Sequence, residues 1–526
     1  MCGILAIHLK NQQKDLDKIY EGWEMLSNRG PDSGSLTISK DFIMGFKRLS
    51  IVDTSPKGNQ PFEHNNAQLI CNGEIYNHKY LEDIYNISCA SGSDCECIIR
   101  LFFKLSWSEL VGRLNGDFAI VITYNNKIFF ARDRIGVRPL FMGITNDGNF
   151  AFASYARVLA SYCTNIKQIP PGWGEYDTIS SEIKLNQFKL PLTPVFMGNN
   201  QRGVRELLIS ATRDRLMSDR PVACLLSGGL DSSLITSIVC SLMGPQNVRT
   251  YSIGMEGSQD LKYARQVAEY LGTNHTEVKF TPREGFEAIP HVIRDLESYD
   301  ITTIRASVGM WLLAKYIAKN SEDIVLLSGE GADELFCGYL YFHYAPTHLE
   351  LEQESFRLIS ELHMYDVLRA DRCVSSHGLE LRVPFLDRRL VEACLSLPGD
   401  VKCPQNYDGI VDTKIEKYLL RSAFAKEKYL PPEIIWRRKD GMSDGMSGNT
   451  GKKWYEQIQD FVDECVSDQE FQKCVDKFPF KEAYYYKKIF DDIFPTFQPK
   501  FKYWLPKWVD HGGDPSGRNL EIFKKD

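Results

Sequence analysis

The sequence lacks the segments that would carry a protein into or across a membrane. No stretch approaches the roughly 20 consecutive apolar residues that a membrane-spanning helix requires. The N-terminus also lacks the basic and apolar regions of a secretory signal peptide. We therefore expect a cytoplasmic chain without membrane association.

Cysteines are too few and too scattered to indicate a disulfide framework. The chain has 14 cysteines in 526 residues, and several lie in apolar contexts, including Cys71, Cys224 and Cys240. Such cysteines are usually reduced core residues. Cys95 and Cys97 form a C-x-C with no second pair at zinc-site spacing, so we expect no structural metal.

The charge balance gives no general attraction to nucleic acid. Lysine and arginine total 62 against 69 acidic residues, for a net charge of -7. A protein that binds phosphate backbones needs a basic patch, and none is visible in the sequence. Hydrophobic residues make up 43%, as in folded soluble proteins, and the length suggests about two to four domains. Small molecules are the expected ligands.

The first half of the chain is dominated by short strand patterns. Apolar runs separated by turn signals occupy residues 3–9, 42–52, 68–71 and 117–133. Within the last run, Asn125 and Asn126 can take the positive φ that a hairpin turn needs. Helical patterns near 16–27 and 94–106 would cover the sheet faces. We predict a layered α+β domain over residues 2–188.

A change of composition separates this half from the next. Residues 189–201, KLPLTPVFMGNNQ, contain prolines, a glycine and asparagines without periodicity, which predicts a linker. Strand and helix patterns then alternate, with strand patterns at 222–226, 248–253, 276–280 and 323–327. This alternation predicts an α/β domain with a parallel sheet over residues 202–526.

A glycine-rich turn follows the strand pattern VACLL. The segment SGGLDSS, residues 227–233, leads from that strand into a helix. Gly228 and Gly229 allow close backbone approach to a ligand, while Ser227 and Ser232 offer hydroxyl groups at the helix start. No Walker motif occurs. The segment resembles the pyrophosphatase loop of enzymes that adenylylate a substrate, which implies that it holds the β and γ phosphates of ATP.

An acidic segment, SGEGADELF at 328–336, follows the next strand pattern. It brings Glu330, Asp333 and Glu334 to the carboxyl end of that strand, where open α/β sheets bind ligands. The same resemblance implies that Asp231 binds magnesium. Because Mg²⁺ takes one or two carboxylates besides phosphate oxygens and water, we predict Asp231 and Asp333 as its protein ligands. Taken alone, each segment could be an ordinary turn.

The cysteine at position 2 has a chemical interpretation. If Met1 is removed, Cys2 carries a free α-amino group with a pKa of about 7.7 to 8.0. That amine could act as the base for the thiol on the same residue, as in N-terminal threonine nucleophiles. The thiolate could then attack an amide, provided that oxyanion donors lie nearby. An incidental cysteine is the alternative.

Four further segments of the first half complete a recognisable pattern. They are RGPDSG at 29–34, RLSIVD at 48–53, NGEIYN at 72–77 and SGSDCE at 91–96. With them, this half resembles the glutamine amidotransferases that use an N-terminal nucleophile. Together with SGGLDSS and SGEGADE, nearly the whole chain resembles the glutamine-hydrolysing asparagine synthetase family. Cys337 stands where that family commonly has glycine, and 132–140 is slightly altered, but neither change touches a reacting group.

The resemblance implies a set of glutamine-site residues. Arg48 matches the clamp for the substrate carboxylate, and Asp94 matches the partner of its ammonium. With Cys2 as the nucleophile, Asn72 and the Gly73 N–H match the oxyanion hole. The predicted glutamine contacts are Arg48, Leu49, Ser50, Ile51, Val52, Asn72, Gly73, Glu74 and Asp94.

The resemblance also implies a set of nucleotide-site residues. Leu226 and Ile253 match positions that flank the adenine. Glu330 matches a residue important for forming the aspartyl adenylate, and Lys439 a basic residue near the reacting phosphates. The residues predicted to bind ATP are Leu226, Ser227, Gly228, Gly229, Asp231, Ser232, Ile253, Ser328 and Gly329.

These motifs together predict a two-domain enzyme that converts L-aspartate to L-asparagine. Hydrolysis of L-glutamine would supply ammonia, and MgATP would activate the β-carboxylate of aspartate as an adenylate. The resemblance also implies an internal ammonia tunnel and a homodimer. Only Arg382 and the segment TTIRAS, residues 302–307, point to the aspartate pocket.

Three alternatives stay open at this point. The first is a related amidotransferase or cyclising synthetase that activates a different carboxylate. The second is a catalytically silent regulatory or storage protein, against which the intact Cys2, Asp231, Glu330 and Asp333 argue. The third is a tRNA-modifying enzyme with a similar ATP loop, which the acidic balance disfavours.

Overall fold

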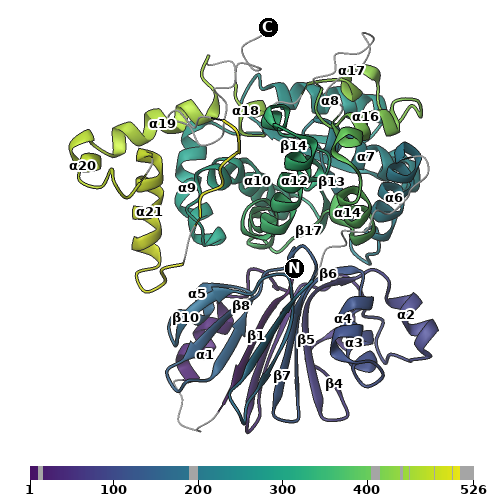
Figure 1. Cartoon of the computed structure of the whole chain (residues 1–526), viewed down its shortest axis with the longest axis vertical. Helices are drawn as coiled ribbons and strands as arrows, with labels where there is room; N and C mark the ends of the chain where they lie inside the picture. Colours follow the sequence, from purple (N-terminus) through teal and green to yellow (C-terminus); the bar gives the residue numbers. More distant parts are fainter. Residues whose placement is uncertain are drawn as a thin grey trace.

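The chain forms two halves that stack on each other (Figure 1). The computed structural model describes residues 1–9, 16–188, 200–403, 415–438, 442–448, 451–478, 480–499 and 502–509. The amino-terminal half (residues 1–188) lies below the carboxyl-terminal half (200–509) in Figure 1, and the N-terminus lies at their boundary. None of the helices within the described ranges has the length and hydropathy of a membrane span.

Two six-stranded antiparallel sheets form the centre of the described part of the amino-terminal half. Their strand orders are β10-β8-β9-β1-β3-β2 and β12-β11-β7-β6-β5-β4. The strands are β1 Gly3–His8, β2 Ser33–Ile38, β3 Phe42–Arg48, β4 Phe62–His64, β5 Ala67–Ile75, β6 Gly116–Tyr124, β7 Lys127–Arg132, β8 Phe141–Thr145, β9 Phe150–Ala153, β10 Cys163–Gln168, β11 Gly172–Asp177 and β12 Ile183–Gln187.

The two sheets pack face to face on an apolar core. Ile4, Phe46 and Val121 are among the fully buried side chains between them. Helices cover the outer faces: α1 Leu16–Glu24 and α5 Ala156–Leu159 on the first sheet, and α2 His78–Tyr85, α3 Glu96–Phe102 and α4 Trp107–Arg113 on the second (Figure 1). The predicted layered α+β architecture is confirmed.

The predicted hairpin turn is also confirmed. Asn125 and Asn126 connect β6 to β7 with φ values of 45° and 57°. Asparagine tolerates this left-handed region better than most residues, and the resulting turn matches the right-handed twist of paired strands. Residues separated by this turn therefore pair in register, with Tyr124 opposite Lys127.

A five-stranded sheet forms the centre of the described part of the carboxyl-terminal half. Its order is β15-β14-β13-β16-β17, and all neighbouring strands are parallel, as predicted. The strands are β13 Val222–Leu225, β14 Arg249–Gly254, β15 Asn274–Lys279, β16 Val325–Leu327 and β17 Glu380–Arg382.

Helices surround this sheet, and some of them begin at local capping signals. In α9, the Thr281 hydroxyl accepts from the Glu284 N–H while the Glu284 carboxylate accepts from the Thr281 N–H, which satisfies two helix-end donors. The helices are α6 Asn200–Asp214, α7 Leu230–Met243, α8 Gln259–Leu271, α9 Pro282–Leu296, α10 Ile301–Asn320, α11 Ala332–Leu335, α12 His348–Glu361, α13 Asp366–Ser375, α14 Arg388–Leu395, α15 Gly399–Lys402, α16 Tyr418–Phe424, α17 Pro432–Ile435, α18 Met442–Gly445, α19 Trp454–Cys465, α20 Asp468–Gln472 and α21 Lys481–Ile493.

The predicted linker is described only at its end. Residues 189–199 lie outside the described residues, and Asn200 and Gln201 belong to the first turn of α6.

Buried ion pairs join the two halves. Arg29 of the amino-terminal half pairs with Asp371 at 2.8 Å, and both side chains are at most 1% exposed. Arg215 of the carboxyl-terminal half pairs with Asp117 at 3.3 Å. Removing one partner of a buried pair typically costs about 3–5 kcal/mol because the other charge is left uncompensated. The boundary between the halves is therefore a fixed interface.

Candidate active sites

Cys2 lies immediately before β1, at the boundary between the halves. Its Sγ lies 3.7 Å from the Leu49 carbonyl oxygen, and its own carbonyl accepts from Arg29 Nε at 2.8 Å. Burial raises the pKa of the Cys2 thiol to about 11, although the nearby terminal ammonium opposes this. The thiol therefore needs a local base to form its thiolate at neutral pH.

The terminal amine next to Cys2 has the properties of such a base. Met1 is 1% exposed, and its ammonium donates to the Leu379 carbonyl of the other half at 3.4 Å. Burial lowers the pKa of this amine to about 6, so it is neutral at physiological pH. Removal of Met1 would leave the new amine on Cys2 itself, in the same buried surroundings.

Hydrogen bonds connect the four motifs of this half to one another. Each bond runs from the backbone of one motif to a side chain of another, so the loops hold each other in place. The Asp32 carboxylate accepts a hydrogen bond from Ser50 N at 2.7 Å. The Asp53 carboxylate accepts one from Gly92 N at 2.8 Å, and the Asp94 carboxylate accepts one from Ile75 N at 2.6 Å. The structure thus brings the predicted glutamine residues into one region.

Asn72 and Gly73 have the features expected of oxyanion donors. Asn72 on β5 is fully buried, and among the described residues neither atom of its side-chain amide has a hydrogen-bond partner. Such an unsatisfied buried amide is costly unless a ligand pairs with it. Gly73 has φ 152°, and a Cβ there would lie 2.1 Å from the Asp117 carbonyl oxygen, so a larger residue cannot replace it.

The predicted clamp residues are buried, but each already has partners within the chain. Arg48 donates to Ser55 O at 2.7 Å and Asn59 Oδ1 at 2.9 Å, and so orders the loop that follows β3. Asp94 is 3% exposed, and burial raises its pKa. Burial, together with Asp94, also raises the pKa of Glu74. Leu49, Ser50 and Ile51 are buried, and Val52 is half-buried.

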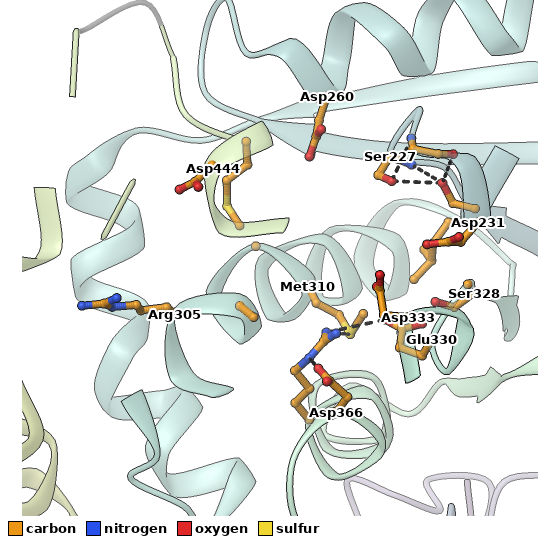
Figure 2. Close-up of a pocket in the computed structure, with 18 of the residues that line it drawn as sticks. Ser227, Asp231, Asp260, Arg305, Met310, Ser328, Glu330, Asp333, Asp366 and Asp444 are labelled. Carbon is orange, nitrogen blue, oxygen red and sulfur yellow. Dashed lines mark hydrogen bonds and ion pairs between the residues drawn. The ribbon is translucent and has the colours of Figure 1, made fainter. Parts of the chain in front are cut away.

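A cavity of about 310 Å³ opens at the carboxyl ends of the parallel strands. Figure 2 shows Ser227, Asp231, Ser328, Glu330 and Asp333 gathered on one side of it. A ligand site at this edge of an open α/β sheet agrees with the general rule for such folds. The predicted nucleotide residues Leu226, Gly229, Ser232, Ile253 and Gly329 also line the cavity.

The SGGLDSS loop has the geometry of an anion cradle. Gly228 has φ 73°, and a Cβ there would lie 2.4 Å from the Ala264 nitrogen, so the tight turn requires glycine. Gly229 caps α7, and the Ser227 and Ser232 hydroxyls lie 3.0 Å apart. The first N–H groups of α7 therefore face the same space as two hydroxyl groups.

Part of the cavity wall is apolar. Leu226, Ile253, Gly309, Met310, Leu313 and Met446 line it. A Cβ on Gly309 would lie 3.1 Å from the Met446 sulfur, so the wall is tightly packed there. Flat aromatic ligands such as an adenine ring suit a surface of this kind.

Lys417 links the two acids predicted to bind magnesium. Its ammonium pairs with Asp333 at 2.8 Å and with Asp231, and its side chain is 3% exposed. Burial alone would lower the pKa of Lys417, but the two carboxylates raise it above its ordinary value. Asp231 Oδ1 is buried and accepts no hydrogen bond from the described residues. The acids thus face a common cation position, and this donor set fits Mg²⁺. No sequence motif pointed to Lys417.

Glu330 faces the cavity between the acid pair and Arg369. It is 7% exposed, and burial raises its pKa. Its Oε1 lies 3.5 Å from Arg369 Nη1, yet neither oxygen accepts a hydrogen bond from the described residues.

The two sequence pointers to the aspartate pocket have different outcomes. Thr302 and Thr303 line the cavity, as expected. Arg382 does not: it lies on β17 and pairs with Glu74 of the other half at 3.3 Å, so its expected place in this pocket is wrong. Lys439 lies outside the described residues.

Comparisons with known proteins agree with this arrangement. The family model "Glutamine amidotransferase domain" matches residues 1–173, and "Asparagine synthase" matches 203–357 and 345–509. The protein named "Asparagine synthetase [glutamine-hydrolyzing]" is 39% identical in Gallus gallus and 38% in Homo sapiens, and each match covers 100% of this chain and 99% of the relative. The match to a solved structure of the "allosteric regulatory enzyme of purine biosynthesis" covers 52% of this chain and 80% of that protein's chain. The sequence identity is 14% and the TM-score is 0.32. The full-length relatives and both family models show that this chain belongs to the glutamine-hydrolysing asparagine synthetases.

Proposed function

We propose that this chain converts L-aspartate to L-asparagine through a β-aspartyl adenylate, with ammonia from L-glutamine, and releases AMP and pyrophosphate. The observation that carries the proposal is the pairing of two sites on one chain. The half-buried Cys2 and the unsatisfied Asn72 amide belong to the amino-terminal half, and an anion cradle with an acid pair lies in the carboxyl-terminal half, across a fixed interface. Family membership makes the overall reaction that of a glutamine-dependent ligase.

In the first site, Cys2 attacks the side-chain amide of glutamine after removal of Met1. Its own amine takes the thiol proton, a role that the lowered pKa of the buried terminal amine supports. The Asn72 amide and the Gly73 N–H stabilise the oxyanion. Arg48 holds the substrate carboxylate and Asp94 its ammonium, while Glu74 and the main chain of residues 49–52 complete the pocket. When the tetrahedral intermediate collapses, its C–N bond breaks and the amine returns the proton to the departing nitrogen, which leaves as ammonia. Water then releases glutamate from the thioester and restores the thiol.

In the second site, Leu226 and Ile253 flank the adenine. The loop with Ser227, Gly228, Gly229 and Ser232 cradles the phosphates, and Ser328 with Gly329 contacts the nucleotide. Glu330 assists the attack of the aspartate β-carboxylate on the α-phosphorus, which expels pyrophosphate. Lys439, outside the described residues, stabilises the departing pyrophosphate in this proposal.

Asp231 and Asp333 are the residues that would hold Mg²⁺. When bound there, the ion would neutralise charge on the ATP phosphate oxygens. Lys417 keeps the two carboxylates close together, because it pairs with both. Its ammonium also adds positive charge beside the phosphate cradle.

Ammonia must travel from the first site to the second without escaping into water. We propose that it crosses the interface, consistent with the position of Met1 against Leu379 of the other half.

The proposal also includes a glutaminase domain over residues 2–188, a linker at 189–201, a synthetase domain over 202–526 and a homodimer. The fourteen free cysteines, all among the described residues, support a cytoplasmic location. The net charge of -7 supports independence from nucleic acid.

The first experiment is pyrophosphate release from MgATP with a panel of carboxylic acids and ammonia as the nitrogen source. We expect release with aspartate and asparagine as the amide product. Release with another acid would keep the chemistry but identify a sister activity. No release with any acid would contradict the proposal and favour a silent scaffold.

A further inference from the structure

The part of the cavity beyond Glu330 contains a cluster of polar groups that the nucleotide does not explain. Its members are Glu334 on α11, Tyr339 after it, and Asp366 and Arg369 on α13. All of them line the cavity that Glu330 also lines. Figure 2 shows Asp366 below Glu330, at the opposite side of the cavity from Asp260.

Hydrogen bonds fix the geometry of this cluster. The Tyr339 hydroxyl lies 2.6 Å from Glu334 Oε1 and 3.1 Å from Asp366 Oδ2, so it links the two carboxylates. Arg369 Nε donates to Asp366 Oδ1 at 2.5 Å. The Tyr339 hydroxyl thereby holds both carboxylates close to each other on the wall of the cavity.

The cluster has more acids than cations. Arg369 lies 3.5 Å from Glu330 and 2.5 Å from Asp366, and Glu334 is joined to Asp366 through the Tyr339 hydroxyl. Glu330 is more than nine-tenths buried, and among the described residues its oxygens accept no hydrogen bond. Buried carboxylates in excess are costly without a compensating cation, so a cationic group of a ligand is expected here.

A second arginine of the cavity wall, Arg305, is engaged elsewhere. Arg305 pairs with Glu482 of α21, with 2.9 Å between Nε and Oε1, and both side chains are at most 3% exposed. In Figure 2 its guanidinium points away from Glu330 and Asp366. Lys417 is likewise engaged with Asp231 and Asp333 at the phosphate end.

We propose that Glu334 and Asp366, linked by Tyr339, form the subsite for the α-ammonium group of the amino-acid substrate. This inference rests on the proposed function, in which the amino-acid substrate is aspartate. Aspartate has one ammonium group and two carboxylates. An ammonium is compact and carries three donors, which suits two carboxylates held by one hydroxyl. With its ammonium there, aspartate extends its β-carboxylate back toward Glu330 and the phosphate cradle. Asp366, with a side chain 24% exposed, is the acid most open to the ligand.

Substrate truncation combined with mutation tests this subsite. Succinate is aspartate without the ammonium, so the ratio of kcat/KM for aspartate over succinate reports recognition of that group alone. Pyrophosphate release would be measured with MgATP and ammonia for the wild type, Asp366→Asn and Tyr339→Phe. Asp463→Asn, an exposed acid of α19, is the charge-matched control.

In Asp366→Asn we expect the KM for aspartate to rise about 100-fold and the aspartate-to-succinate ratio to fall by a similar factor, because a charged hydrogen bond to the substrate is lost. The KM for ATP should change less than about twofold, and Asp366→Glu should recover part of the ratio. Tyr339→Phe should lower the ratio by about tenfold, since it only loosens the two acids.

Three results would overturn the inference. One is an unchanged KM for aspartate in Asp366→Asn. Another is an equal loss with aspartate and succinate, because that pattern reports a structural role. If Asp366→Asn does not fold, the third is an unchanged ratio of kcat/KM for aspartate over succinate in Tyr339→Phe. A wild type that releases no pyrophosphate with aspartate would instead contradict the proposed function.

Discussion

The two sites differ in how complete they are before any ligand binds. At the amino-terminal site, Arg48 and Asp94 are already hydrogen-bonded within the chain, and loops hold one another in place. At the carboxyl-terminal site, acids outnumber cations around a cavity of about 310 Å³, and Glu330 accepts no hydrogen bond from the described residues. The first site is organised by backbone hydrogen bonds, whereas the second needs its substrates to balance its charge.

This difference follows from the chemistry of each step. Attack on an amide requires fixed oxyanion donors, because charge develops at one oxygen. Adenylate formation requires three separate ligands to meet, so their charges can complete the site. We therefore expect substitutions in the first site to affect turnover, and substitutions in the second to affect ligand binding as well as turnover.

The sharpest test of separate sites is Cys2→Ala. It should reduce glutamine-dependent asparagine formation by about 10⁴-fold or more, because the nucleophile is lost. Synthesis from added ammonia should stay within about twofold of wild type. Both rates would be measured by asparagine formation, with Cys89→Ala, another half-buried free cysteine of the same half, as the matched control. Loss of both activities in a folded variant would argue against two separable sites.

The complementary substitution in the second site is Asp231→Asn. It removes a predicted Mg²⁺ ligand and a partner of Lys417, so aspartate-dependent pyrophosphate release should fall about 10³-fold. Glutamate formation from glutamine should continue. Asp400→Asn, an exposed acid, should change neither rate. Normal pyrophosphate release in Asp231→Asn would show that the magnesium assignment is wrong.

Asn72→Ala tests whether the first site acts mainly on the transition state. We expect kcat for glutamine hydrolysis to fall about 10²- to 10³-fold, as for other oxyanion donors, with little change in KM. Steady-state glutaminase kinetics would measure this, and ammonia-dependent synthesis is the internal control. A raised KM with unchanged kcat would instead indicate a role in binding glutamine.

A smaller effect concerns the interface rather than either site. Asp387 is fully buried and pairs with Arg215, which also contacts Asp117 of the other half. Burial alone would raise the pKa of Asp387, but Arg215 and Arg389 lower it to about 2. A depressed folded-state pKa contributes stability that is present above the unfolded value near 3.9 and lost as pH falls toward 2.

Asp387→Asn should therefore reduce the free energy of unfolding by about 2–3 kcal/mol at pH 7. The difference from wild type should shrink to about half at pH 3, where the unfolded-state carboxyl is largely protonated. Urea unfolding at the two pH values measures both quantities. A difference that does not depend on pH would mean that packing, and not the ion pair, supplies the stability.

Much of the fold was predictable because its signals are local. The Asn125–Asn126 turn and the strand VACLL before SGGLDSS depend on neighbouring residues, and the structure has both where the sequence indicates them. The acids Asp231 and Asp333 follow adjacent strands of a parallel sheet, so their meeting at one edge was also predictable.

Residues whose partners are distant in the chain could not be inferred in this way. Lys417 reaches Asp231 across 186 positions, and no pattern around it indicates that contact. Arg382 lies on β17, the neighbour of β16 in the sheet, yet its side chain pairs with Glu74 of the other half. Asp366 lies at the first turn of α13, where an acid is also a common helix-start residue.

The Arg29–Asp371 pair has a consequence for how such chains can be recombined. Asp371 accepts from Arg29 at 2.8 Å and from Arg138 at 3.4 Å, and all three side chains are at most 1% exposed. A hybrid that takes its glutaminase half from one relative and its synthetase half from another must therefore inherit both arginines and this acid together. Ancestral changes at these three positions would have been tolerated only in concert, which makes the boundary a barrier to domain shuffling.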